Sequence, residues 1–376
     1  MNVRQGRHPQ ATSTLIGEVV KHKCIDPSVG MCKPKEIMNY MQMDYGVSMS
    51  YKKAWRSREQ ALKSLYGNSI ESYAFLPKLR YMIETKNPGS LFDLVTGEGG
   101  VFISFFMSLG PWRTGWKYIR PVIIVDGTHL KNYYKGTLYT ACGMDGNKQI
   151  FPLAYCIGPS ESNETWIYFF AKLKDAIGER EEQVFVSDRH AGIINGIKTV
   201  FPNCDHGFCM YHLHGNLKTT FKGITKEVKW KFYGASKAYT QREFESFMVM
   251  LDAENPEIRR YLANDVGYQR WARCMFRRKR YGIMTNNNAE ALNALNVKVR
   301  QFPVSKLMDW LRERSMKWFY ERRDAAAKTN TLLTKVYQAK ADKYIAYAVR
   351  MEVNGFRQLT SIVDIRCQQL TGFVDI

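Results

Sequence analysis

Three acidic residues stand where an α/β protein commonly presents reactive groups. Asp126 directly follows the apolar run PVIIV, and Asp188 ends the similar run VFVSD. Glu290 lies in TNNNAEALNALN, near the start of an expected helix, where the helix dipole favours an anion. Taken singly, each position is more typical of a structural carboxylate. Taken together, the three could hold two Mg²⁺ or Mn²⁺ ions, because hard cations prefer carboxylate oxygens and phosphoryl transfer on DNA uses such a pair.

Five cysteine and histidine residues follow Asp188 within a short stretch. They are Cys204, His206, Cys209, His212 and His214. Such a cluster could hold zinc, since thiolate and imidazole are its usual ligands. Structural zinc sites, however, generally use two separated ligand pairs, and no second pair follows at a finger-like distance. A structural or DNA-positioning role for Cys209 and His212 is therefore favoured over zinc.

Three further residues allow a functional interpretation beside an ordinary one. His129 and His190 could orient water or phosphate, although an exposed histidine is the ordinary explanation. Trp166 could stack on an unpaired base. Because Trp166 shares one helical face with other apolar residues, a core position is favoured.

A run of four basic residues comes shortly before Glu290: Arg277, Arg278, Lys279 and Arg280. Runs of this kind can clamp phosphates or serve as a nuclear address. The ordinary alternative is the solvated end of a helix. All four are candidate DNA-binding residues.

The whole chain is strongly basic. Its 376 residues contain 55 Lys and Arg against 35 Asp and Glu, a formal net charge of +20. Such a surplus indicates a polyanionic partner, because basic side chains that neutralise phosphates release counterions from nucleic acid. No apolar run reaches the roughly 20 residues of a membrane span, and the first ten residues lack a secretory signal's apolar core. The eight scattered cysteines favour reduced thiols in an intracellular protein. DNA is thus favoured over a membrane.

Residues 1–90 are expected to be helical, and the turn signal NPGS at 87–90 marks a boundary. Apolar and aromatic residues recur at helical spacing in Lys35–Tyr45 and Tyr51–Tyr66. The two helices could form a helix-turn-helix that reads DNA. A helical lead-in packed on the next domain is the favoured alternative, because no base-reading residues stand out.

The segment beyond residue 90 is expected to form a mixed sheet covered by helices, an α/β architecture. The expected strands are Pro121–Val125, Gly136–Cys142, Gln149–Cys156, Gln183–Val186 and a stretch near Asp205–Met210, with helices over Thr165–Ile177 and Gly192–Val200. Residues 213–283 then become helical and basic. Helices over Asn288–Arg300 and Val304–Thr329 follow, and the tail from Tyr344 is expected to be β-like over Ala346–Val353 and Thr360–Ile365.

Several of these segments resemble the Mutator-like element (MULE) DNA transposases of plants. The resemblance runs from VDGTHLKNYYKGTLYTACGMDGNKQIFPLAYCIGPSESNETWIYFFAKLKDAI through VSDRHAGIINGIKTVFP, FCMYHLHGNLK and TNNNAEALNALN, with SYKKAWRSREQAL and SYAFLPKLRYMIETKNPGS upstream. It covers roughly residues 10–365. It implies a ribonuclease-H-like core over 91–212 and 284–343, a helical insertion over 213–283, a helical N-terminal region over 1–90 and a β-like tail over 344–376.

The resemblance also implies a function. A DDE-type transposase would cleave and join DNA at Asp126, Asp188 and Glu290, with Cys209 and His212 as the family's CxxH pair beside the active site. Its partners would be transposon terminal repeats and target DNA, its place the nucleus, and a homo-oligomer would bring two transposon ends together. The family's N-terminal zinc-binding region and C-terminal SWIM zinc finger are not evident, so truncation at both ends is expected. The alternatives are a catalytically silent, transposase-derived nuclear DNA-binding regulator and an inert fragment; a general ribonuclease H fits least well.

Overall fold

The computed structural model describes residues 8–24, 33–132, 135–297 and 299–349. Its centre is a seven-stranded sheet in the order β1-β2-β5-β4-β3-β6-β7. The strands are β1 Leu91–Thr96, β2 Phe102–Ser108, β3 Val122–His129, β4 Thr137–Met144, β5 Ile150–Gly158, β6 Val184–Ser187 and β7 Asp205–Phe208. Neighbours from β1 to β3 pair antiparallel, whereas β3, β6 and β7 are parallel. The predicted mixed α/β architecture is confirmed.

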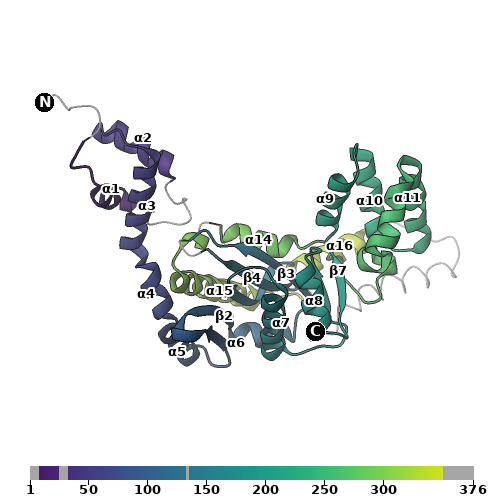
Figure 1. Cartoon of the computed structure of the whole chain (residues 1–376). Coiled ribbons are helices and arrows are strands. Elements are labelled where there is room, and N and C mark those ends of the chain that lie inside the picture. Colours follow the sequence, from purple (N-terminus) through teal and green to yellow (C-terminus); the bar gives the residue numbers. More distant parts are fainter. Residues whose placement is uncertain (1–7, 25–32, 133–134, 298, 350–376) are drawn as a thin grey trace.

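Helices cover both faces of the sheet. Adjacent residues of β4 show this directly, because Tyr139 packs edge-on against Trp166 of α7 whereas Thr140 donates a hydrogen bond to Asn293 of α14. The helices are α6 Gly110–Trp116, α7 Asn163–Ile177, α8 Ala191–Val200, α14 Asn287–Leu295 and α15 Val304–Ala327. In Figure 1, α7 and α8 lie in front of the sheet and α15 runs behind it. Polar side chains on one face of β3 and β4 therefore contact helix α14.

Aromatic residues, which make up 13% of the chain, form the core under α7. Trp166 stacks on Phe170, which meets Phe185 of β6 and Phe201 edge-on, and all four are fully buried. The core interpretation of Trp166 is confirmed, and the base-stacking alternative is wrong. The chain is thus anchored rigidly on both sides of β6, the strand that leads to Asp188.

The N-terminal region is helical as predicted, with α1 Ser13–Val20, α2 Pro34–Tyr45, α3 Tyr51–Tyr66, α4 Ser69–Ala74 and α5 Leu76–Lys86. Helices α4 and α5 pack on α15 and β1. Helices α1, α2 and α3 form a separate group beyond them, which we call the N-terminal lobe (Figure 1).

A second helical group lies between β7 and α14. It comprises α9 Met210–Thr220, α10 Lys226–Lys237, α11 Gln241–Glu254, α12 Pro256–Tyr261 and α13 Tyr268–Trp271, with a π-helical turn at Leu262–Val266 and a 3₁₀ turn at Arg273–Met275. Buried residues of these helices form a hydrophobic cluster of their own around Phe232, Phe244 and Trp271. In Figure 1 this second lobe and the N-terminal lobe rise on the same side, with α14 between them.

Two sequence expectations are wrong at the C-terminal side. Lys335–Ala348 forms helix α16, so the β-like tail predicted from Tyr344 is helical as far as Ala348. The alanines of this segment favour a helix, and Ala341 is buried. The predicted helix Asn288–Arg300 ends at Leu295, before a 3₁₀ turn at Val299–Gln301. Residues 350–376, including the predicted strand Thr360–Ile365, lie outside the described residues. No helix in the described part of the chain is long and apolar enough to span a membrane.

Candidate active site

Strand register brings Asp126 and Asp188 to the same edge of the sheet. In the parallel pair of β3 and β6, Ile124 lies opposite Val186. Each aspartate follows two residues later in the chain, Asp126 within β3 and Asp188 directly after β6. Parallel neighbours present matching positions side by side. The two carboxylates therefore arise at equivalent points, as the two apolar runs in the sequence predict.

Glu290 reaches this edge from α14. Its backbone amide donates to Asn286 O at 3.1 Å, which closes the first turn of the helix. One turn later, Asn293 Nδ2 donates to Asp126 Oδ2 at 2.7 Å, while Thr140 Oγ1 donates to Asn293 Oδ1 at 3.2 Å. This pair of bonds fixes α14 across β3 and β4. The third acid is thereby held beside the first.

Asp126 lies near enough to Asp188 and Glu290 for their charges to affect its ionisation. Burial raises the pKa of Asp126 to about 7, and the negative charges of Asp188 and Glu290 act in the same direction. The hydrogen bond from Asn293 and the charge of His212 act against this shift. A carboxylate held near like charges in a half-buried position disfavours ionisation unless a cation is present. Without a cation, repulsion disfavours the state in which all three acids are ionised.

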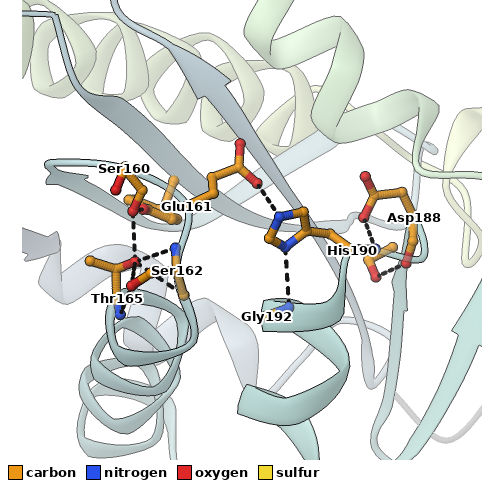
Figure 2. A network of polar contacts seen from close by, with 9 residues as sticks. Ser160, Glu161, Ser162, Thr165, Asp188, His190 and Gly192 are labelled. Carbon is orange, nitrogen blue, oxygen red and sulfur yellow. Dashed lines mark hydrogen bonds and ion pairs between the residues drawn. The ribbon is translucent and has the colours of Figure 1, made fainter.

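Asp188 is held by the start of α8. The backbone N–H of His190 donates to Asp188 Oδ1 at 3.1 Å, and the ring of His190 accepts from Gly192 N at 3.2 Å (Figure 2). On the other side of this ring, Nε2 lies 3.9 Å from Glu161 Oε2. His190 thus caps a helix and orients the Asp188 loop. Its side chain is 37% exposed, so it lies at the surface while making these contacts.

Glu161 escaped the sequence analysis, and Gly127 makes room for it. A Cβ atom built on Gly127 would lie 2.7 Å from Glu161 Oε1. Gly127 pairs with Tyr139 and Asp126 pairs with Thr140, so Glu161 approaches from the α7 face and Asp126 faces α14. Glu161 supports the site from behind. The signal in the sequence was the glycine directly after Asp126.

Cys209 and His212 lie against Glu290. In the register of β6 and β7, Ser187 is opposite Phe208, and Cys209 N donates to Ser187 O at 2.7 Å. The ligand atoms of Cys209, His212 and Glu290 all lie within 4.8 Å of one another. The CxxH pair therefore belongs to the same edge of the sheet as the acids.

His212 carries positive charge into this acidic group. Its hydrogen bond with the Cys209 side chain raises the pKa of His212 to about 9, and the charges of Glu290 and Asp188 act in the same direction against burial. Nε2 of His212 lies 3.6 Å from Glu290 Oε1. An imidazolium partly offsets the repulsion among the carboxylates.

The other members of the cysteine and histidine cluster do not converge. His206 is buried, with Nε2 2.8 Å from Ser187 Oγ, and burial lowers its pKa to about 3. His214 is buried beside the Phe232 ring in the second lobe. Cys204 Sγ lies 3.7 Å from Glu179 Oε1. Among the described residues, a zinc ion at this cluster would have Cys209 and His212 as ligands, with Glu290 as the third.

The side chains of the basic run 277–280 differ in burial and in their contacts. Arg280 is 3% exposed and donates to the backbone carbonyls of Ile283, Trp271 and Phe208 at 3.2, 3.4 and 3.3 Å. Its prediction as a DNA-binding residue is wrong, because its guanidinium is buried and hydrogen-bonded to backbone carbonyls. The run is also no helix end, since it lies in a loop before α14.

The remaining residues of the run stay candidates. Arg277 NH2 lies 2.8 Å from Asp205 Oδ1, while Arg278 donates to Gln183 O at 2.9 Å. Lys279 is exposed. Exposure therefore separates these four neighbouring cations, although their sequence context does not.

A cavity of about 330 Å³ opens between the second lobe and the loop before α14. It is lined by Met210, Tyr211, Tyr233, Lys237, Gly282, Met284, Thr285 and Asn287. His129, exposed at the end of β3, does not line this cavity; its carbonyl accepts a hydrogen bond from Arg300 at 3.0 Å. Aromatic and basic side chains thus form part of the lining of this cavity.

Comparison with known proteins agrees with this region of the chain. Residues 122–216 match the model of the MULE transposase domain family. The matched range contains Asp126, Asp188, Cys209 and His212. Over 118 residues the chain is 30% identical to the transposase for insertion sequence element IS256 in transposon Tn4001, from both Staphylococcus aureus and Enterococcus faecalis. Each match covers 31% of this chain and 28% of the relative, so the chain spans little more than a quarter of the relatives' length.

Proposed function

We propose that this chain is the catalytic core of a DDE-type transposase that acts in the nucleus, on a ribonuclease-H-like fold with the second lobe as its insertion. The observation that carries the proposal is that Asp126, Asp188 and Glu290 lie near enough at one sheet edge for their charges to interact, with the two aspartates inside the range that matches a transposase domain. The reaction would be cut-and-paste: hydrolysis of a strand at a transposon terminal repeat, then attack of the freed 3′-hydroxyl on target DNA. Both steps are in-line displacements at phosphorus, so one site can serve both.

The residues of the site fit two Mg²⁺ or Mn²⁺ ions. Asp126 and Asp188 would bind both ions, and Glu290 would complete one coordination sphere. Glu290 Oε1 supports this assignment, because it is buried and accepts no hydrogen bond from any described residue. When bound, the ions would polarise phosphoryl oxygens and lower the pKa of an attacking water. Zinc at Cys209 and His212 would compete for Glu290, so it is the less favoured metal.

The side chains around the acids have separate tasks in this proposal. Asn293 and Asn286 donate to the two oxygens of Asp126, at 2.7 and 3.3 Å, and so fix the plane of its carboxylate. The His190 amide does the same for Asp188. His212 holds Glu290 by charge. Geometry fixed in this way favours reaction, because little reorganisation remains when substrate binds.

Two copies of the chain would act together, since two transposon ends must be joined in one event. No described contact tests this expectation. The terminal repeats and the target DNA are the proposed nucleic-acid partners, in keeping with the net charge of +20.

A strand-cleavage assay with a matched control tests the proposal. Linear and branched DNA would be incubated with Mg²⁺ or Mn²⁺ and the wild-type chain, Asp126→Asn, Asp188→Ala or Asp175→Asn. Asp175 is an exposed carboxylate of α7 that pairs with Lys172, so its change controls for lost charge. We expect cleavage to disappear in the first two variants, by a factor on the order of a thousand or more, and to persist in the third.

The outcomes separate the competing functions. Cleavage that survives Asp126→Asn would refute the assignment of the acids. Salt-sensitive DNA binding by the wild-type chain without any cleavage would indicate the DNA-binding regulator instead. Neither cleavage nor binding would indicate an inert fragment.

A further inference from the structure

Helix α3 of the N-terminal lobe carries an exposed face that the core does not use. Tyr51 is 55% and Trp55 44% exposed, although both are large aromatic residues. Lys52 and Arg56 are exposed beside them. Gln60, also exposed, follows one turn later at the border with α1, where its Cβ lies close to Gly17. The opposite face is buried through Ala54, Ser57, Arg58, Ala61 and Leu62. The helix is therefore packed from one side and open along its length on the other.

The packing of the lobe makes this helix rigid. Gly17 of α1 lets the helix backbone approach α3 closely, since a Cβ there would lie 2.8 Å from Ser57 O. At its far end, the ring of Tyr66 meets Phe302 of the core with centroids 4.2 Å apart. The open face of α3 is thus presented from a fixed frame joined to the core.

The connection between α2 and α3 is a short turn. Four residues, Gly46 to Met49, separate the end of α2 from the Ser50 cap. Gly46 has φ 65°, in the left-handed region that ends a helix cheaply, and Ser50 Oγ accepts from Lys53 N at 3.3 Å. A short turn of this length, containing glycine, is typical of a helix-turn-helix unit.

The charge of the lobe complements a polyanion. Residues 8–24 and 33–66 contain nine Lys and Arg against four Asp and Glu. Glu59, the acidic residue of α3, is occupied by Arg58 at 2.9 Å. Within the described residues, Lys52, Arg56 and Lys63 form no ion pair, so their charge is available to a partner. A second copy of this lobe would meet the same surplus of positive charge and is disfavoured.

We infer that the open face of α3 enters the major groove of duplex DNA and reads its sequence. The major groove admits one α-helix, and the first turns of a recognition helix usually meet the base edges. Arg56 has the donor fork that matches guanine, Gln60 can pair with adenine, and Trp55 offers an apolar contact to a thymine methyl group. Lys52 and Lys63 suit the flanking phosphates. In the sequence alone these residues do not stand out, because the buried face of α3 is not known there.

This inference does not rest on the proposed catalysis, and binding measured without divalent ions tests it. Duplexes with a random core would be selected on the wild-type full chain, and the affinity for the selected duplex would be measured by fluorescence anisotropy at several salt concentrations. The variants would be Arg56→Ala, Lys52→Ala and Lys117→Ala. Lys117, an exposed lysine directly after α6, serves as the matched control. Figure 1 shows α6 below the sheet, away from α1, α2 and α3.

The expected pattern distinguishes base readout from phosphate contact. Arg56→Ala should weaken binding to the selected duplex roughly tenfold or more and relax the selected sequence at one position. Lys52→Ala should weaken binding to every duplex and lower the salt slope by about 0.9. Lys117→Ala should change neither. Circular dichroism and thermal midpoints would show that the variants remain folded.

Three results would overturn the inference. Selection could yield no preferred sequence, in which case α3 is at most a phosphate clamp. Arg56→Ala and Lys117→Ala could lose the same small affinity. Arg56→Ala could leave DNA binding intact and instead change the sedimentation of the protein, which would identify the face as a contact between copies of the chain.

Discussion

The acidic edge of the sheet and the basic loop 277–280 gather like charges in opposite ways. At the edge, the negative charges of Asp126, Asp188 and Glu290 interact. Amide groups donate hydrogen bonds to Asp126, and the imidazole of His212 lies beside Glu290. In the loop, Arg280 is surrounded by backbone carbonyls, and Arg277 lies on Asp205. In the loop, groups of the fold itself bind Arg277 and Arg280. At the edge, one imidazole offsets only part of the charge of the three acids.

This difference separates a structural charge from one held for a partner. A fold that stabilises its buried charges has no need of a ligand, whereas one that tolerates repulsion among carboxylates is typical of a functional site. The two regions should therefore respond with opposite sign when a charge is removed. Removing the buried cation Arg280 from the loop should destabilise the protein, and removing an anion from the edge should stabilise it.

The largest effect is expected for Arg280→Met. The substitution keeps much of the buried volume but leaves three carbonyl oxygens without a donor, and a buried polar group without a partner costs roughly 1–3 kcal/mol. The free energy of unfolding should fall by roughly 3 kcal/mol or more in urea denaturation. The affinity of the folded variant for DNA should stay unchanged. A stable variant with weakened DNA binding would restore Arg280 as a DNA contact and break the comparison.

The opposite sign is expected for Asp126→Asn in the absence of metal. The folded-state pKa of Asp126, about 7, lies above that of an unfolded aspartate. A group raised in this way stabilises the fold at low pH, and that contribution is lost as the pH rises through about 7. At pH 8 the neutral asparagine should raise the free energy of unfolding by roughly 2–4 kcal/mol, whereas at pH 4 it should have little effect.

Metal ions sharpen the same test. Mg²⁺ or Mn²⁺ binds the ionised carboxylate, so affinity should increase with pH up to about 7 and proton release should accompany binding. Titration calorimetry at pH 6 and pH 8 would measure both. Asp126→Asn should bind the metal weakly at either pH. When the metal is saturating, the wild-type protein should therefore have the higher free energy of unfolding. Destabilisation by Asp126→Asn at pH 8 without metal would show that the edge is neutralised after all.

Regular secondary structure explains how much of this edge could be foreseen. The apolar runs before Asp126 and Asp188 predict two buried strands, and equal placement after each run is enough to bring the carboxylates together. Glu290 could be proposed from its helix. Asn286 and Asn293 were missed, although seven residues, two helical turns, place both on the face of α14 that meets Asp126.

Loops and strand pairs far from the motifs were less predictable. Strands β1 and β2 escaped detection because LFDLVT and FISFFMS lack clear alternation. The fate of Arg280 depends on Gly207, whose missing side chain leaves room for the guanidinium 2.8 Å from where a Cβ would lie. Nothing in the local run encodes that contact. The partition of neighbouring cations into buried and exposed is a tertiary property.

A smaller effect is expected behind the acidic edge, for Gly127→Ala. The added methyl group must displace the Glu161 carboxylate, whose side chain is flexible enough to move. We expect a loss of about 1 kcal/mol in the free energy of unfolding, and no further loss when Glu161→Ala is added, because the clash is then gone. Additive losses in the double variant would mean that Glu161 and Gly127 are not in contact. Strand cleavage should fall with Gly127→Ala if the Glu161 contact to His190 helps to hold the Asp188 loop.

The smallest effects are expected for the exposed cations of the loop, where two neighbours make a matched pair. Arg277 lies on Asp205, whereas Lys279 forms no ion pair with any described residue. Both variants should leave the urea midpoint unchanged. If an ion pair within the protein keeps a cation from binding DNA, Lys279→Ala should lower the salt slope of DNA binding by about 0.9 and Arg277→Ala by less. Asp205→Asn should then free Arg277 and strengthen binding. Equal effects of the two alanine variants would show that an exposed surface ion pair does not withhold a cation from DNA, and the rule drawn from this loop would hold only for buried charges.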